Sequence, residues 1–244
     1  MEAFILAAGL GTRLRPFTLL HPKALVEVGG RPMLGRVIDR LRDEGFDRIV
    51  VNVHHFPDQI ENWLAANSPE GVVTAISDER LQLLETGGAI LHAEPLLEAG
   101  GDRPFLIHNV DILSDAPLGT LMRRHIEEGN DVTLLVSARK SSRRLLFDSE
   151  GSLKGWHSLA DGSWRPADAR ISAGDSLLAF SGIHVMSPSV FAEMRRQGRS
   201  GAFSVIDFLL EAIGHLKIKA YRLDSLRLID IGKPETLSQA NQLF

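Results

Sequence analysis

Short apolar runs and amphipathic stretches alternate along the first half of the chain. The apolar runs predict buried β-strands, and apolar residues spaced three or four positions apart predict helices. The predicted strands are 4–6, 48–53, 71–76, 105–107 and 132–136. The predicted helices are 32–44, 59–66, 86–98 and 118–128. Such alternation is typical of a mainly parallel sheet that is covered by helices.

The pattern changes in the second half. Residues 141–175 are rich in Ser, Arg, Asp and Gly, which predicts hairpins and loops. We expect later strands at 178–185, 217–223 and 227–231, and helices at 203–213 and 234–243. The sequence therefore predicts one α/β domain over residues 1–244. Its expected architecture is a Rossmann-like, mainly parallel sheet flanked by helices, with a small β-rich insertion.

Composition excludes several classes of protein. The chain has 244 residues, 44% apolar and 24% charged, which is ordinary for a globular protein. A net charge of −4 argues against general binding to nucleic acid, and the absence of Cys excludes thiolate catalysis. The apolar stretch Ala3–Ala8 is too short to cross a membrane, and Glu2 replaces the basic flank of a signal peptide. We expect a cytoplasmic protein with no membrane partner.

A glycine-rich segment, LAAGLGTRLRP at 6–16, follows the first predicted strand. Leu14 replaces the third glycine of a dinucleotide fingerprint, and no Gly-Lys-Ser/Thr follows as in a Walker A loop. The glycines would let backbone N–H groups approach an anion, and the cations would bind it. These residues are Gly9, Gly11, Arg13, Arg15 and Lys23. The pattern indicates a triphosphate site or, alternatively, a tight surface turn with solvated cations.

A second glycine pair stands at the start of the predicted helix 86–98. The segment Leu84-Glu85-Thr86-Gly87-Gly88-Ala89 would permit close approach of a flat ring, and a helix start offers free N–H donors. The preceding segment 77–80, which includes Glu79, is expected to line the same pocket. The alternative is a glycine-rich helix entrance that binds no ligand.

Two aspartates follow predicted strands. Asp111 stands just beyond strand 105–107, and a carboxylate at the carboxyl end of a parallel strand faces the ligand crevice of α/β proteins. Asp230 lies in the segment 228–234. Their alternative roles are a solvated strand end for Asp111 and a helix cap for Asp230. We expect His54, His55 and His108 to be packed or solvated rather than ligands.

The segment from Leu6 to Leu34 resembles the signature of the sugar-1-phosphate nucleotidylyltransferases, also called nucleotide-sugar pyrophosphorylases. It contains their Gly-Thr-Arg-Leu core, Pro-Lys pair and Pro-Met pair, and later motifs extend the resemblance over nearly the whole chain. The resemblance implies nucleotidyl transfer from a nucleoside triphosphate to a sugar 1-phosphate, with release of pyrophosphate and with Mg2+ as cofactor. It also implies a nucleotide-binding half at about 1–137, a sugar-binding half at about 138–233 and a C-terminal helix at 234–244.

The resemblance also implies roles for individual residues. The catalytic residues would be Arg13, Lys23 and Asp111, with Asp111 and Asp230 as Mg2+ ligands. The nucleotide-binding residues would be Leu6, Ala8, Gly9, Gly11, Thr12, Arg13, Lys23, Glu79, Glu85, Thr86, Gly87 and Gly88. The sugar-binding residues would be Asn109, Arg143, Ser181 and Gly182. Departures from the family pattern are Val110 for a glycine, Leu228 for a tryptophan and Lys233 for a threonine.

Substrate choice is expected from two short motifs. The Glu-Thr-Gly-Gly turn and Phe-Ser-Gly-Ile at 180–183 resemble small bacterial enzymes that uridylylate N-acetylmuramate 1-phosphate in cell-wall recycling. The expected partners are therefore UTP and this sugar phosphate, for a monomer or small homo-oligomer. The alternatives are a mannose-1-phosphate guanylyltransferase and a non-catalytic sugar-nucleotide sensor. A sensor would keep the glycine loop but lose Lys23, Asp111 or Asp230, and all three are present.

Overall fold

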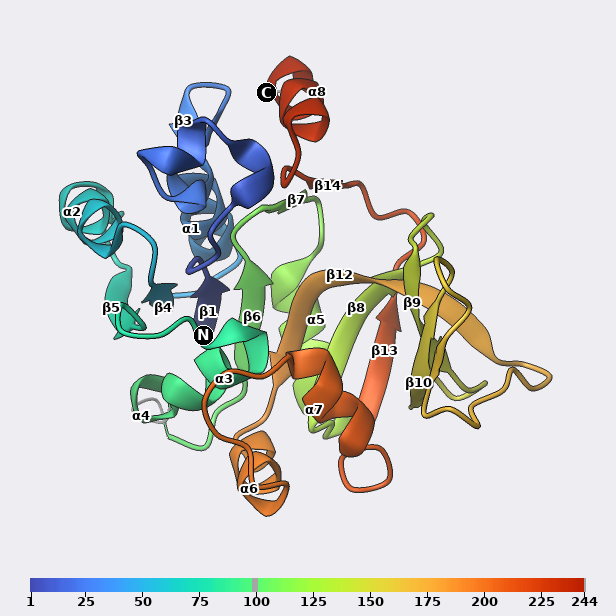
Figure 1. Cartoon of the computed structure of the whole chain (residues 1–244). Helices are drawn as coiled ribbons and strands as arrows, with labels where there is room; N and C mark the ends of the chain where they lie inside the picture. The colour runs from blue at the N-terminus through green and yellow to red at the C-terminus, as the bar shows by residue number, and fades with distance from the viewer. Residues whose placement is uncertain (98–100, 244) are drawn as a thin grey trace.

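The computed structural model describes residues 1–97 and 101–243. In these residues a ten-stranded sheet extends across the molecule with helices on both faces (Figure 1). Its strand order is β11-β10-β9-β12-β6-β1-β4-β5, and β8 and β13 join it beside β12. The strands are β1 (Glu2–Leu6), β4 (Arg48–Val53), β5 (Val73–Asp78), β6 (Phe105–Asn109), β8 (Val132–Ser137), β9 (Arg143–Phe147), β10 (Leu153–Ser158), β11 (Trp164–Arg165), β12 (Ser176–Met186) and β13 (Ile218–Arg222).

The strands of the first half run parallel, as the sequence predicts. β1 pairs in parallel with β4 and with β6, and β4 pairs in parallel with β5. β12 runs antiparallel to β6 and continues past a bulge to pair with β9 of the β-rich part. The predicted α/β fold, a mainly parallel sheet with a β-rich insertion, is confirmed.

Successive residues of a strand point to opposite faces of the sheet, and this alternation builds two cores. Phe4 of β1 packs into a core with α3 and α7, whereas Ala3 and Ile5 pack into the other core with α1 and α2. All three side chains are fully buried. The helices are α1 (Met33–Asp43), α2 (Pro57–Asn67), α3 (Glu85–His92), α4 (Glu94–Leu97), α5 (Leu118–Glu128), α6 (Ser189–Arg196), α7 (Val205–Glu211) and α8 (Pro234–Leu243).

The structure corrects some predicted elements. The helix predicted at 86–98 is divided into α3 and α4, because Pro95 has no N–H to continue the first helix; Glu98, its predicted end, lies outside the described residues. Helix α6 was not predicted. The strand predicted at 227–231 is β14 (Leu228–Asp230), which pairs with β7 (Ile112–Ser114) in a small separate sheet. A second small sheet pairs β2 (Glu27–Val28) with β3 (Arg31–Pro32).

The topology brings several loops to one edge of the sheet. Because β1, β4, β5 and β6 run parallel, the segments that follow them all emerge at their carboxyl ends. The glycine loop follows β1, Asp111 follows β6, and the turn into α3 follows β5. None of the helices in the described part of the chain has the length and apolarity needed to cross a membrane.

Candidate active site

A cavity of about 370 Å³ lies at this edge of the sheet. It is lined by Leu6, Ala8, Gly9, Lys23, Asn52, Leu83, Glu85, Thr86, Asn109, Val110, Asp111 and Ser204. The cavity thus collects predicted residues from the glycine loop, from the Glu85–Gly88 turn and from the end of β6. We call it the nucleotide cavity. Several predicted site residues lie around it rather than on its lining.

Lys23 and Asp111 form an ion pair in the nucleotide cavity. The Nζ of Lys23 donates to Oδ2 of Asp111, and their side chains are only 12% and 17% exposed. Lys23 comes from the short 3-10 helix η3 (Lys23–Leu25), and Asp111 from the turn between β6 and β7. The fold therefore brings together two of the three residues predicted as catalytic, which are far apart in the sequence.

Gly11 shapes the glycine loop around Lys23. Its φ is 60°, in the left-handed region, and a Cβ there would lie 2.9 Å from the Cβ of Lys23 and 2.8 Å from Cγ2 of Thr18. Thr18 fixes the loop because its Oγ1 donates to the Gly11 carbonyl at 2.9 Å. A Cβ at Gly9, in contrast, would have no heavy atom within 4 Å and would face open space in the cavity. Gly11 thus serves the loop's own packing, and Gly9 leaves room for a ligand.

Arg13 and Asp230 both approach Gly232. A Cβ on Gly232 would lie 2.7 Å from Nη2 of Arg13 and 2.8 Å from Oδ1 of Asp230, so both groups border the same small space. Arg13 is carried by η1 (Thr12–Leu14), and neither it nor Thr12 lines the cavity. Oδ1 of Asp230 accepts the backbone N–H of Gly232 at 2.7 Å. A larger residue at 232 would therefore displace the side chains of Arg13 or Asp230.

The segments that carry the two aspartates are hydrogen-bonded to each other. Asp230 in β14 pairs with Ile112 in β7, the residue next to Asp111, and the N–H of Ile231 donates to the Asp111 carbonyl at 3.0 Å. Carboxylate oxygens are the ligands that Mg2+ prefers, with phosphate oxygens and water completing its octahedron. No group of three or more metal-ligating side chains occurs in residues 1–97 and 101–243. Two carboxylates alone would leave most of the octahedron of Mg2+ to phosphate oxygens and water.

Glu79 does not line the nucleotide cavity but holds Asn52, which does. It is 3% exposed, and its carboxylate accepts Nδ2 of Asn52 at 2.7 Å and the N–H of Leu84 at 3.2 Å. Oδ1 of Asn52 in turn accepts the N–H groups of Ala7 and Ala8 at 2.5 and 3.2 Å. Burial raises the pKa of Glu79. This chain of hydrogen bonds ties the glycine loop to the turn that precedes α3.

The glycine pair of the Glu85–Gly88 turn packs against the segment 201–203. Gly87 and Gly88 are inside the first turn of α3, where a Cβ would lie 2.4 Å from Cε2 of Phe203 and 2.2 Å from the carbonyl oxygen of Gly201, respectively. Their N–H groups donate to the Phe203 carbonyl at 2.8 and 3.2 Å. The segment before α7 therefore occupies the space on the Cβ side of both glycines. Glu85, whose φ is 58°, and Thr86 do line the cavity.

The predicted sugar residues are divided between two places. Asn109 lines the nucleotide cavity, and Gly182 lies against it: its φ is 81°, and a Cβ would lie 2.7 Å from Nδ2 of Asn109. Ser181 is buried, and its Oγ accepts the N–H of Ile183 at 3.1 Å inside the β12 bulge. Arg143 lines a second cavity of about 620 Å³, which meets the first at Ser204.

Some cavity residues were missed by sequence reasoning. Asn52 and Ser204 line the nucleotide cavity, and Ser204 also caps α7 through the N–H of Ile206 at 3.2 Å. Asn52 had a detectable signal, since it is the polar residue inside the apolar run of β4. Arg139 was also missed. Burial lowers the pKa of Arg139 and the carboxylate of Asp230 partly opposes this shift, which puts another cation near the aspartate pair.

A model of the nucleotidyl transferase family matches residues 2–147. The chain belongs to this family. An N-acetylmuramate alpha-1-phosphate uridylyltransferase from Caulobacter vibrioides is 38% identical over 210 residues, 84% of this chain and 81% of the relative. Another from Neisseria meningitidis serogroup B is 46% identical over 115 residues, 47% of this chain and 48% of the relative. The predicted family and the predicted class of enzyme are confirmed.

The fold of this nucleotidyl transferase is also found among solved structures. A putative glucose-1-phosphate thymidylyltransferase from Bacillus anthracis superimposes with a TM-score of 0.81, covering 100% of this chain and 95% of the other. The identity is 16%, so this likeness concerns the fold alone.

Proposed function

We propose that the chain transfers a uridylyl group from UTP to N-acetylmuramate 1-phosphate and releases pyrophosphate. The observation that carries this proposal is the convergence of the open Gly9 loop, Lys23, Asp111 and the Glu85–Thr86 turn on one cavity. The choice of UTP and of this sugar is supported by the Caulobacter vibrioides relative, which matches most of the chain. A cytoplasmic location for a pathway of cell-wall recycling is part of the same proposal.

The chemistry requires positioning and charge neutralisation more than proton transfer. A sugar phosphate oxygen is already ionised at neutral pH, so it can attack the α-phosphorus of UTP without a general base. The obstacle is the mutual repulsion of two polyanions. Lys23 is directed into the cavity by Asp111 and would bind the triphosphate, while Arg13 would stabilise charge on the transferring group and the leaving pyrophosphate.

Asp111 and Asp230 would hold Mg2+, which the pairing of β14 with β7 and the hydrogen bond from Ile231 to the Asp111 carbonyl support. Held by these two residues, Mg2+ would supply positive charge that offsets the repulsion between the two phosphorylated substrates. The N–H groups around Gly9 would bind phosphate oxygens, and the residues of the Glu85–Thr86 turn would contact the base. Asn109, held against Gly182, would contact the sugar.

The test is pyrophosphate release in the presence of Mg2+, with UTP and GTP crossed against N-acetylmuramate 1-phosphate and mannose 1-phosphate. We expect release with UTP and the muramate sugar only. Release confined to GTP and mannose 1-phosphate would keep the reaction and replace both substrates. No release from folded protein in any combination would contradict the proposal and favour a sensor.

A further inference from the structure

The second cavity, of about 620 Å³, lies between the β-rich part and the start of α7, in the region where Figure 1 shows β9 and β10 near that helix. Ser204 lines this cavity and the nucleotide cavity, so the two spaces adjoin. A substrate that is bound at Asp111 could therefore extend into the second cavity. We call it the outer cavity.

One face of the β-rich hairpins forms a wall of the outer cavity. In the strand register Arg143 is paired with Ser158, and Trp156 is paired with both Leu145 and Arg165. Directly paired residues point to the same face of a sheet, and residues two apart in a strand do so as well. Arg143, Trp156 and Arg165 therefore share this face, and all three line the cavity. The wall combines an aromatic surface with two guanidinium groups.

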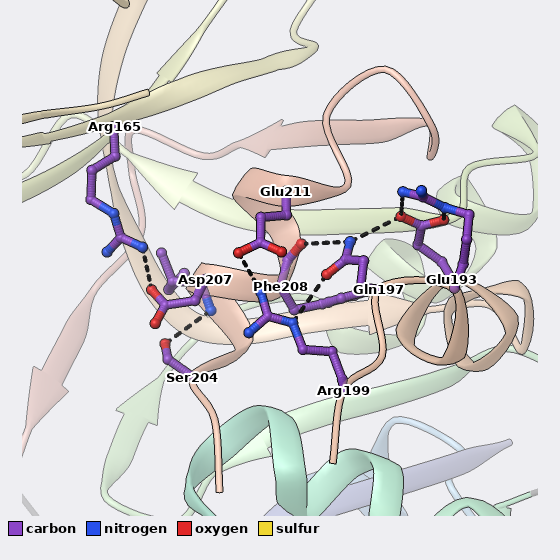
Figure 2. Close-up of polar contacts among 10 residues, drawn as sticks. Arg165, Glu193, Gln197, Arg199, Ser204, Asp207, Phe208 and Glu211 are labelled. Carbon is purple, nitrogen blue, oxygen red and sulfur yellow. Dashed lines mark hydrogen bonds and ion pairs between the residues drawn. The ribbon is translucent and has the colours of Figure 1, made fainter. Parts of the chain in front are cut away.

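Of these two guanidinium groups, that of Arg165 is already paired with a carboxylate. Arg165 donates from Nη2 to Oδ1 of Asp207 at 2.5 Å, as Figure 2 shows, and its Cζ lies 5.5 Å from the ring centroid of Trp156. Asp161 is a carboxylate that also lines the outer cavity. It is bound by Ser163 and not by Arg143, since it accepts both the N–H and the Oγ–H of Ser163, at 3.0 and 2.7 Å. The side chain of Arg143, in contrast, has no hydrogen-bond or ion-pair partner in residues 1–97 and 101–243.

We propose that Arg143 binds a carboxylate on the sugar of an acidic sugar 1-phosphate. The inference rests on the proposed function, since it assigns the residue that recognises the carboxylate of the proposed sugar. A guanidinium is always charged and matches a carboxylate with two parallel hydrogen bonds. The anion at Arg143 is not the reacting phosphate, because that group belongs beside Lys23 and Asp111, in a cavity that Arg143 does not line. Trp156 supplies an apolar surface for the ring of the sugar.

The experiment compares two sugars that differ only in the carboxylate-bearing lactyl ether, N-acetylmuramate 1-phosphate and N-acetylglucosamine 1-phosphate. Dissociation constants are measured by calorimetry on the full chain, with Mg2+ and α,β-imido-UTP, which cannot react. Arg143→Gln is compared with Arg143→Lys and with the control Arg123→Gln. Arg123 is an exposed arginine of α5 that contacts Thr120 and lines neither cavity.

We expect Arg143→Gln to weaken binding of the acidic sugar roughly tenfold and to leave the neutral sugar unchanged. Arg143→Lys should lose less, and Arg123→Gln should lose nothing. Equal weakening of both sugars would assign Arg143 to the phosphate, and no weakening of either would remove it from the site; both results overturn the inference. Pyrophosphate release is measured in parallel. Its absence with every substrate, while Arg143 still discriminates between the sugars, contradicts the proposed function and leaves the carboxylate site standing.

Discussion

At the scale of single residues, two arginines of one loop, Arg13 and Arg15, allow a controlled comparison. Both are exposed and line neither cavity, but a Cβ on Gly232 would meet Arg13 and Asp230, and it would not meet Arg15 among its three nearest atoms. We expect Arg13→Ala to lower kcat by roughly 10²–10³-fold, because one preorganised donor to the transferring charge is lost. Arg15→Ala should stay within about threefold of wild type. Steady-state pyrophosphate release measures both variants, and equal effects would deny Arg13 a role in the reaction.

Asn52 shows how one buried side chain connects the loops of the site. It accepts two N–H groups of the glycine loop and donates to Glu79, which holds the turn before α3. Asn52→Ala leaves these buried groups without partners, and we expect a loss of about 2 kcal/mol in the free energy of unfolding, with a higher KM for UTP. Urea titration and steady-state kinetics measure the two effects. A change in stability with an unaltered KM would mean that Asn52 stabilises the fold but does not position the glycine loop for UTP.

At the scale of elements, the glycines of the two loops have separable roles. We expect Gly88→Ala to destabilise the chain by about 1–3 kcal/mol, since the new Cβ would push the 201–203 segment away from α3. Gly9→Ala should leave the melting temperature unchanged, because no atom lies near its Cβ position, but should raise the KM for UTP by filling space in the cavity. Thermal unfolding and kinetics of both variants check this contrast. Reversed effects would exchange the roles assigned to the two glycines.

Some features of the site could be predicted from the sequence, and the contacts of these glycines could not. The pairing of Lys23 with Asp111 agrees with the family resemblance, and Asp111 could also be expected at the site because it follows a predicted parallel strand. The contact of Gly87 and Gly88 with 201–203 could not, because it joins segments more than a hundred positions apart and leaves no local signal. Helix α3 ended early for a reason visible in the sequence, namely Pro95. The placement of Arg143 in a separate cavity depends on the strand register, which no single motif specifies.

At the scale of the whole molecule, buried histidines in β6, α5 and β12 couple stability to pH. Burial lowers the pKa of His108 and of His125 to about 4 and that of His184 to about 3, from an ordinary value of 6.5. The unfolded chain therefore binds more protons than the folded chain below pH 6.5. Stability should fall as the pH drops from 6.5 toward 4. Buried Glu2 and Glu79, whose pKa values are raised, oppose this trend near their own range.

His184 isolates the effect of one buried histidine. It lies in β12 with neither ring nitrogen hydrogen-bonded in the described residues, and its ring meets Phe180 edge-on at 5.4 Å. Because its pKa is lowered in the folded chain, His184 gains a proton mainly on unfolding when the pH falls below 6.5. The free energy of unfolding should therefore be lower by about 2 kcal/mol at pH 5 than well above pH 6.5. His184→Leu should flatten the decline of the melting temperature between pH 6.5 and 5 relative to wild type. Since His108 and His125 remain in the variant, a smaller slope should persist; an unchanged slope would mean that His184 is protonated in the folded chain.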